Sequence, residues 1–174
     1  MPHTRTTAVL VTALVGAATV AALAQAPAKK PASPPASPKH SIINAADLKW
    51  GPPPPGLPPG AQVAVVDGDP TKAGPFVLRA KFPDGYKVAP HSHATDENIT
   101  VISGSLSLGM GDSTDAGTLT ALGPGAFARM PRNMHHYAMA KGETIFQLHA
   151  MGPFAITYVN PNDDPRKKTT TESK

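Results

Sequence analysis

Apolar residues between positions 41 and 160 fall in short runs rich in Val, Ile, Phe and Thr, separated by Gly, Pro and Asp. No part of this region shows the apolar repeat of about 3.6 residues that an amphipathic helix needs. We therefore expect strands at 62–66, 76–82, 98–102, 105–108, 118–122, 127–130, 137–139, 144–150 and 155–159. About nine strands at this spacing indicate an all-β sandwich or barrel.

Short segments rich in glycine, proline and aspartate are expected to form the turns between these strands. Residues 103–105 (Ser-Gly-Ser) and 141–143 (Lys-Gly-Glu) each separate two apolar runs, which predicts two tight hairpin turns. Residues 67–70 and 83–85 are two further turn sequences. A proline-rich stretch at 52–59 leads into the first strand, so we expect an arm across the barrel rather than a ligand for a partner domain.

The first 24 residues have the features of an export signal. Arg5 precedes an apolar stretch at 8–24, which ends in the A-x-A cleavage sequence Ala22-Leu23-Ala24. The alternative, a membrane anchor, is disfavoured because the stretch is rich in Ala and Gly and falls short of the roughly 20 residues of a membrane span. We expect cleavage after Ala24, a periplasmic or secreted mature protein, and no stable membrane insertion after cleavage.

The rest of the chain divides into three parts by composition. Residues 25–40 are rich in Pro, Ala, Ser and Lys and have almost nothing apolar to bury, so we expect a disordered linker. Residues 41–161 are expected to form the β-domain, which is long enough for one modest hydrophobic core. Residues 162–174 are polar and are expected to form a frayed C-terminal tail.

Cysteine is absent from all 174 residues. Its absence excludes disulfide scaffolds, thiol nucleophiles, iron–sulfur clusters and Cys-type zinc sites. The net charge of +4 does not indicate a nucleic-acid surface, because residues 41–160 contain eight Lys or Arg against nine Asp or Glu. The excess positive charge lies in the terminal segments, whereas a phosphate-binding protein needs cations on its folded surface. We expect no nucleic-acid partner.

Five of the seven histidines fall between positions 91 and 149. His91 and His93 are two residues apart, so on a strand both side chains leave the same face, and Glu97 has the same parity. Two imidazoles and a carboxylate in one short segment suit a divalent transition metal. A third imidazole comes from a later segment, from His135 or His136. Adjacent residues on a strand point to opposite faces, so only one of these two is expected to serve.

The segments around these histidines resemble the two signature motifs of the cupin superfamily. The first motif, G-x5-H-x-H-x3-E-x6-G, is complete here as Gly85-YKVAP-His91-S-His93-ATD-Glu97-NITVIS-Gly104. The second motif is G-x5-P-x-G-x2-H-x3-N, and the chain keeps its first Gly, its Pro and its His at Gly125, Pro131 and His136. Asn133 stands at the second Gly, which is compatible because Asn also adopts positive φ, and Ala140 replaces the final Asn.

The resemblance implies a cupin double-stranded β-helix, that is, a jelly-roll β-barrel, with a metal held by His91, His93, Glu97 and His136. His135 is the adjacent alternative to His136. The overall layout also resembles single-domain cupins related to ChrR-type anti-sigma factors. This narrower likeness implies the fold and the metal but not the regulatory role, because an exported chain cannot restrain a cytoplasmic sigma factor.

The metal implied by the resemblance is one divalent ion among Fe, Mn, Ni, Zn, Co and Cu, of which we favour Fe(II). A six-coordinate ion in this ligand set keeps two positions open, which favours an enzyme: a dioxygenase-like oxidoreductase acting on a small organic molecule, with isomerase, lyase or hydrolase chemistry as variants. The alternatives are a non-catalytic cupin that binds or senses a small ligand, and a purely structural metal site.

Three further residues are candidates for the surroundings of the metal. Gln147 and His149 share a parity on a late strand and are candidates for lining the pocket, and Tyr137 is a candidate for its wall. His149 is a candidate hydrogen-bonding partner or general base, although a lone histidine often has only a structural role. The resemblance also implies a possible homodimer, because barrels of this kind often pack edge to edge.

Overall fold

The computed structural model describes residues 40–114 and 119–168. The expected export signal, residues 25–39 of the expected linker and residues 169–174 of the expected tail lie outside these ranges. The strands of the described residues are β1 (Gln62–Asp67), β2 (Gly74–Phe82), β3 (Lys87–Ser92), β4 (Glu97–Met110), β5 (Thr120–Leu122), β6 (Phe127–Met130), β7 (His136–Gly152) and β8 (Thr157–Tyr158). The helical segments are η1 (Ala45–Asp47), η3 (Pro161–Asp163) and α1 (Pro165–Lys168).

The all-β expectation is confirmed, with one strand that the hydrophobic pattern missed. β3 was not expected because Pro90 interrupts its apolar run, and proline normally marks an edge strand or an irregular position. In the structure, Pro90 lies where the register between β3 and β7 shifts, between Val88 and His91. The last observed strand, β8, is shorter than the strand expected at 155–159.

The two hairpin turns expected at 103–105 and 141–143 are wrong. Both segments lie inside long strands, β4 and β7, which pair along their length. Gly104 and Gly142 have φ of 78° and 72°, and the register between the two strands shifts there. A glycine in the left-handed region inserts a bulge that bends a strand without ending it. The glycines therefore mark bends rather than chain reversals.

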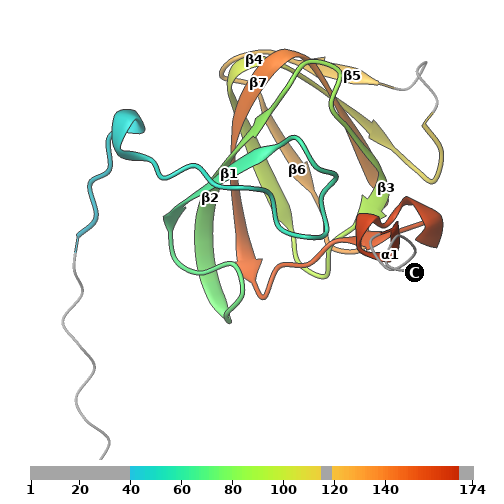
Figure 1. Ribbon diagram of the computed structural model, residues 1–174, viewed down its shortest axis with the longest axis horizontal. Helices are drawn as coiled ribbons and strands as arrows, with labels where there is room; N and C mark the ends of the chain where they lie inside the picture. The colour runs from blue at the N-terminus through green and yellow to red at the C-terminus, as the bar shows by residue number, and fades with distance from the viewer. Residues whose placement is uncertain (1–39, 115–118, 169–174) are drawn as a thin grey trace, which may run out of the picture. The chain divides into compact units, whose positions relative to one another are not determined.

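Because β4 and β7 bend, each contributes to two groups of strands. Residues 144–152 of β7 pair with β2, and residues 97–100 of β4 pair with β6; together with β1 these form the first half-sheet. Residues 136–139 of β7 pair with β3, which also pairs with β8, and residues 106–108 of β4 pair with β5; these form the second half-sheet. Figure 1 shows the strands curling around a common interior, as a jelly-roll barrel requires.

The interior of the barrel is filled by the inward-facing side chains of both half-sheets. Val101 and Phe146 come from the first half-sheet, Leu106 and Ala140 from the second, and all are at most 4% exposed. Inward and outward positions alternate along β7 from Thr144 to Ala150, as a strand with one solvent-facing side predicts. This core fixes the positions of the strands that carry the candidate site.

The proline-rich segment 52–59 lies across the barrel, as the sequence predicted. Gly51 forms an isolated bridge with Val63 of β1, which anchors the start of the segment. The Tyr158 hydroxyl donates a hydrogen bond of 2.8 Å to the Gly56 carbonyl, and the Tyr86 hydroxyl donates one to the carbonyl of Pro58. Among the described residues, no helix has both the length and the apolar character needed to cross a membrane.

Candidate metal centre

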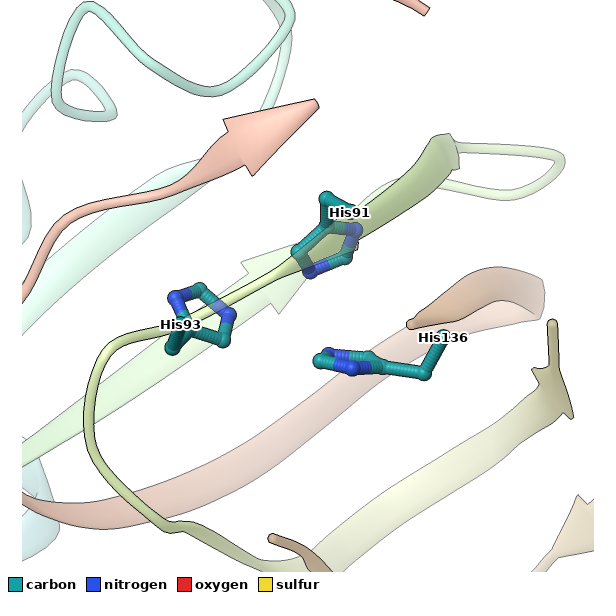
Figure 2. Close-up of side chains that lie close together, drawn as sticks. All are labelled: His91, His93 and His136. Atoms are coloured by element: carbon teal, nitrogen blue, oxygen red, sulfur yellow. The ribbon is translucent and has the colours of Figure 1, made fainter. Parts of the chain in front are cut away.

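Four buried polar side chains meet where the two half-sheets face each other. His91 of β3 pairs with His136 of β7 in the second half-sheet, and His93 follows the end of β3. Glu97 is the first residue of β4 and belongs to the first half-sheet. All four are 7% exposed or less. Figure 2 shows the rings of the three histidines turned toward a shared space.

The distances between these side chains are short enough for one ion to contact all of them. One ring nitrogen from each of the three histidines lies within 4.8 Å of the others. Glu97 Oε2 lies 3.1 Å from His136 Nε2 and 3.7 Å from His93 Nε2. Because a Zn–N or Zn–O bond is about 2.0–2.2 Å, donor atoms around one ion lie 3–4 Å apart. The separations therefore suit a single mononuclear centre.

The backbone fixes which ring nitrogen of each histidine faces the shared space. Nδ1 of His91, His93 and His136 lies 2.7, 2.8 and 3.0 Å from the carbonyl oxygens of Ala89, Ala155 and Met134, respectively. A carbonyl only accepts, so each Nδ1 must carry the proton and donate it. Nε2 of each neutral ring is then an unprotonated donor atom for a metal, oriented by the hydrogen bond on the other side of the ring.

The buried donor atoms have no hydrogen-bond partner within the described part of the protein. His93 Nε2, Glu97 Oε2 and His136 Nε2 are all buried and unsatisfied. Leaving such atoms unpaired in a protein interior costs free energy, and most buried polar groups are paired for that reason. A divalent cation would satisfy all three at once, so the residues present fit a metal.

Burial and mutual contact set the charges of the four groups. Burial, assisted by the neighbouring His136 and His93, lowers the pKa of His91 to about 3, and burial also lowers the pKa of His93. Burial alone would raise the pKa of Glu97, but the adjacent imidazoles, His136 first, hold it below its ordinary value. Burial opposes the charged form of His136, yet Glu97 raises its pKa overall. The cluster thus holds a carboxylate beside neutral imidazoles at His91 and His93.

His135, the alternative to His136, lies outside this cluster. It precedes β7 and is exposed, and its Nδ1 lies 2.6 Å from Oδ1 of Asp112. Adjacent residues point to opposite sides, so when His136 faces the barrel interior His135 faces solvent. The structure brings His136, not His135, together with His91 and His93.

The three candidates for the surroundings of the metal do not line the cavity beside it. Gln147 and His149 lie on the same side of β7 as expected, but this side faces away from the barrel interior. Gln147 Nε2 lies 2.7 Å from Nε2 of the exposed His149. Tyr137 is buried, but it lies next to His136 and packs against Gly109 on the opposite face of β7. The expectation that these residues line the pocket is corrected, because the parity that turns His136 inward turns them outward.

Several residues that support the site were not found from the sequence. The ring of Phe154 stacks on that of His93, with centroids 4.2 Å apart and planes at 16°. Asp96 accepts hydrogen bonds from the Arg129 side chain and from the backbone N–H of Arg132, which ties the loop before Glu97 to the loop before His136. These contacts join segments far apart in the chain. No local pattern marks them.

The candidate centre forms one wall of an apolar cavity of about 340 Å³. Inward-facing residues of both half-sheets line the cavity, including Leu78, Leu106 and Phe146. The proline-rich arm contributes residues 54–57, and the segment after β7 contributes Phe154 and Ile156. An apolar pocket with a few convergent polar groups is the usual form of a small-molecule site.

Comparison with known proteins identifies the family. The family model described as the ChrR cupin-like domain matches residues 38–155. No curated protein matches. Solved structures that are similar include the polyketide cyclase RemF from Streptomyces resistomycificus (20% identity, TM-score 0.60, 77% of this chain and 95% of that chain).

Two further similar structures carry the names of enzymes. A putative acetylacetone dioxygenase from Methylibium petroleiphilum PM1 has 18% identity and a TM-score of 0.56, over 73% of this chain and 85% of that chain. A structure of the DMSP lyases RdDddP and RnDddQII has 15% identity and a TM-score of 0.53, over 67% of this chain and 64% of that chain. At these identities the likeness concerns the fold alone. Because the matched family region covers more than half of the sequence and contains all four candidate ligands, this chain belongs to the ChrR cupin-like domain family of the cupin superfamily.

Proposed function

We propose that this protein binds one divalent transition metal through His91, His93, Glu97 and His136 and uses it to act on a small organic molecule, as a dioxygenase-like oxidoreductase with Fe(II). The observation that carries the proposal is the set of buried, unsatisfied donor atoms on one wall of the apolar cavity. A cluster kept only for stability would be expected to satisfy its own polar atoms.

The chemistry of the bound ion would be that of a Lewis acid or redox centre with open positions for substrate and O₂. The chain's own residues supply the rest. Carbonyls of Ala89, Ala155 and Met134 hold the three rings in one tautomer, so no reorganisation is needed when the ion binds. The apolar walls exclude water from the substrate, which strengthens electrostatic interactions near the ion.

The similar structures support small-molecule chemistry but not one reaction. Their names include a polyketide cyclase, a putative acetylacetone dioxygenase and DMSP lyases. All of these names refer to small organic substrates, and they belong to different reaction classes. The barrel therefore supports several reactions, and the choice of an oxidoreductase comes from the open ligand positions that we infer for the ion.

A second function, ligand binding or sensing without turnover, is favoured by one observation. Apart from the four candidate ligands and Arg166, no titratable side chain of the described residues lines the cavity. A reaction that needs a separate general acid or base would lack one here. Oxygenation on a metal does not require such a group, so the observation argues against hydrolase chemistry more than against dioxygenase chemistry.

The metal assignment is tested by elemental analysis of the full chain and four variants. We expect about one transition-metal ion per chain in the wild type and in His135→Ala, and loss of the ion in His91→Ala, His93→Ala and His136→Ala. His135→Ala is the matched control, because it removes a neighbouring exposed imidazole. Retention of the ion in His136→Ala together with its loss in His135→Ala would overturn the ligand set.

Catalysis is tested with the protein reconstituted anaerobically with Fe(II). We expect O₂ consumption with at least one member of a library of phenols, diketones and keto acids, and no consumption in His91→Ala. Tight binding of a library member without O₂ uptake or product would favour the sensing function instead. If no library member binds or is converted, only a structural role remains for the metal.

We also propose that the protein is exported, because of the signal-like sequence before Gln25. Expression of the full chain in a bacterium with two membranes should place it in the periplasm. N-terminal sequencing of that material should begin at Gln25. Recovery of the protein only from the cytoplasm, with Met1 or Pro2 at its N-terminus, would contradict export.

A further inference from the structure

The cavity beside the candidate metal centre has a sharply divided chemistry. At one wall lie the four candidate ligands, and the remaining lining is apolar apart from one arginine at the rim. The apolar lining comes from both half-sheets and from Leu57 of the proline-rich arm. A hydroxyl-rich or multiply charged ligand would lose its water here without gaining hydrogen bonds, which is costly. The body of the ligand must therefore be apolar.

The four candidate metal-binding side chains and the ion set the charge that the bound small molecule has to balance. Each of the three imidazoles donates from Nδ1 to a backbone carbonyl, which leaves Nε2 for an ion, and Glu97 adds one carboxylate. Metal binding needs the neutral form of each imidazole, because the ion takes the place of a proton on Nε2. Three neutral imidazoles, one carboxylate and a divalent ion leave a net charge of +1. One negatively charged oxygen donor from the ligand would bring the site to neutrality.

The arginine at the rim is already engaged with a carboxylate of its own segment. Arg166 donates from Nε and Nη2 to the two carboxylate oxygens of Asp164, at 2.7 Å each, and from Nη2 to the Ile156 carbonyl at 3.1 Å. A bidentate pair of this kind is among the stronger charge-assisted contacts in proteins. Among the described residues that line the cavity, the one cation is therefore already paired, and a second negative charge on the small molecule would have to compete with Asp164 for it.

The cavity has room beside the candidate centre for a small molecule, about one ring or a short branched chain. Its volume of about 340 Å³ lies at the lower end of the roughly 300–1,000 Å³ that small-molecule pockets have. The wall formed by the arm is tight, since a Cβ added at Gly56 would collide with the Ile156 side chain.

We propose that the cavity selects a small apolar molecule with a single enolate- or phenolate-type oxygen for the metal, and discriminates against ligands with a second negative charge. This inference rests on the proposed function, because the charge to be balanced is that of the metal-loaded centre. It adds a substrate class to that proposal and assigns the Asp164–Arg166 pair the role of keeping the rim neutral.

The test uses the full chain loaded with Co(II), whose visible spectrum reports ligand coordination, with metal content measured in the same samples. The probes are 4-methylphenol, 4-hydroxybenzoate (a similar size, with a carboxylate charge in addition to its phenol oxygen) and 4-fluorotoluene (no oxygen donor). We expect 4-methylphenol to bind at least tenfold more tightly than 4-hydroxybenzoate by calorimetry, and to change the cobalt spectrum. We expect 4-fluorotoluene to leave the spectrum unchanged.

A pair of variants tests the role assigned to the rim. Asp164→Asn removes the counter-charge of Arg166, so 4-hydroxybenzoate should gain about tenfold in affinity while 4-methylphenol stays within twofold. Asp163→Asn is the matched control, because it removes one negative charge from the same segment and keeps the ion pair between Asp164 and Arg166. Equal gains in both variants, or none in Asp164→Asn, would overturn the role of the pair.

The outcomes separate this inference from the proposed function. Protein that takes up no Co(II) would contradict the proposed function, and the inference would fall with it. Protein that holds the ion but binds 4-hydroxybenzoate as well as 4-methylphenol, or binds neither, would overturn the inference alone and leave the metal centre standing.

Discussion

The protonation of single histidine nitrogens decides what the site can bind. Nδ1 of His91 donates to the Ala89 carbonyl two residues earlier, and Nδ1 of His136 does the same with Met134. In the neutral form of each ring, these bonds leave Nε2 unprotonated toward the interior. The inward parity of His91 and His93 was predictable from the spacing. The tautomer was not, because it depends on carbonyls whose directions follow from the fold.

The metal-free protein should become less stable as the pH falls from 7 to 5. The pKa of folded His91 is about 3, whereas the unfolded chain has the ordinary value of about 6.5, so the unfolded state takes up the proton first. Stability is therefore present above about pH 6.5 and is lost as the pH falls toward the folded pKa. The lowered pKa of His93 acts in the same direction, and the raised pKa of His136 offsets part of the loss.

The expected loss attributable to His91 is about 2 kcal/mol at pH 5, since one pKa unit corresponds to about 1.4 kcal/mol. Urea unfolding with a chelator present, at several pH values, measures it. His91→Gln, which cannot titrate, should show a shallower dependence on pH than the wild type. The same slope in both proteins would contradict the assignment.

Asn133 occupies a backbone position that most residues avoid. Its φ is 60°, and it is the non-glycine residue with positive φ in the described part of the chain. Asn133→Gly should leave stability unchanged or slightly higher, because glycine adopts this conformation at no steric cost. Asn133→Ala should destabilise by about 1–2 kcal/mol. Urea unfolding of the two variants distinguishes them, and equal stability would show that the backbone relaxes to another conformation.

At the scale of elements, the bends of β4 and β7 make a two-sided site possible. Glu97 lies in the first half-sheet and His136 in the second, and both half-sheets share these two strands. Straight strands would keep the carboxylate and the imidazole on one surface. The bends at Gly104 and Gly142 turn one sheet back over the other, so that side chains from both meet in the interior.

Gly104→Ala should destabilise the protein by about 2 kcal/mol or more. A Cβ at this position would collide with the Glu143 carbonyl and Thr144, and φ is in the left-handed region. Gly123→Ala is the control, because no atom lies within 4 Å of the added Cβ and φ is not positive there; its effect should stay within about 0.5 kcal/mol. Thermal unfolding measures both. Equal melting temperatures would mean that β4 does not need glycine to bend.

For the molecule as a whole, the candidate centre adds a further link between the two half-sheets, besides the core that they share. His91 and His136 lie in one half-sheet, Glu97 in the other, and His93 contacts the segment after β7 through Ala155. An ion held by all of them would stabilise only the folded chain, since the unfolded chain does not bring the ligands together. Metal binding should therefore be visible as stability.

Chelation should lower the melting temperature of the protein. At a metal concentration 100 times the dissociation constant, binding contributes about 2.7 kcal/mol, which chelation removes. The drop should persist in His135→Ala and vanish in His136→Ala. Scanning calorimetry with and without chelator measures it. A melting temperature that does not respond to chelator in the wild type would contradict a metal that bridges the half-sheets.

Much of this protein was determined by local sequence. The short apolar runs fixed an all-β fold, and the spacing of His91, His93 and Glu97 placed three donors on one face, because strand periodicity is a local property of the backbone. The choice of His136 over His135, and positive φ at Asn133, were implied by resemblance to the cupin motifs, and the geometry agrees.

Other features were decided only by tertiary structure. The segments around Gly104 and Gly142 have sequences typical of hairpin turns. They form bends instead, because β4 and β7 pair with each other on both sides of these glycines. Gln147 and His149 have a shared parity that the sequence displays, but which side of β7 faces the cavity depends on what packs against it. The contacts of Asp96 with Arg129 and Arg132 join residues distant in the chain. Such contacts depend on the spatial course of the backbone, which no local pattern encodes.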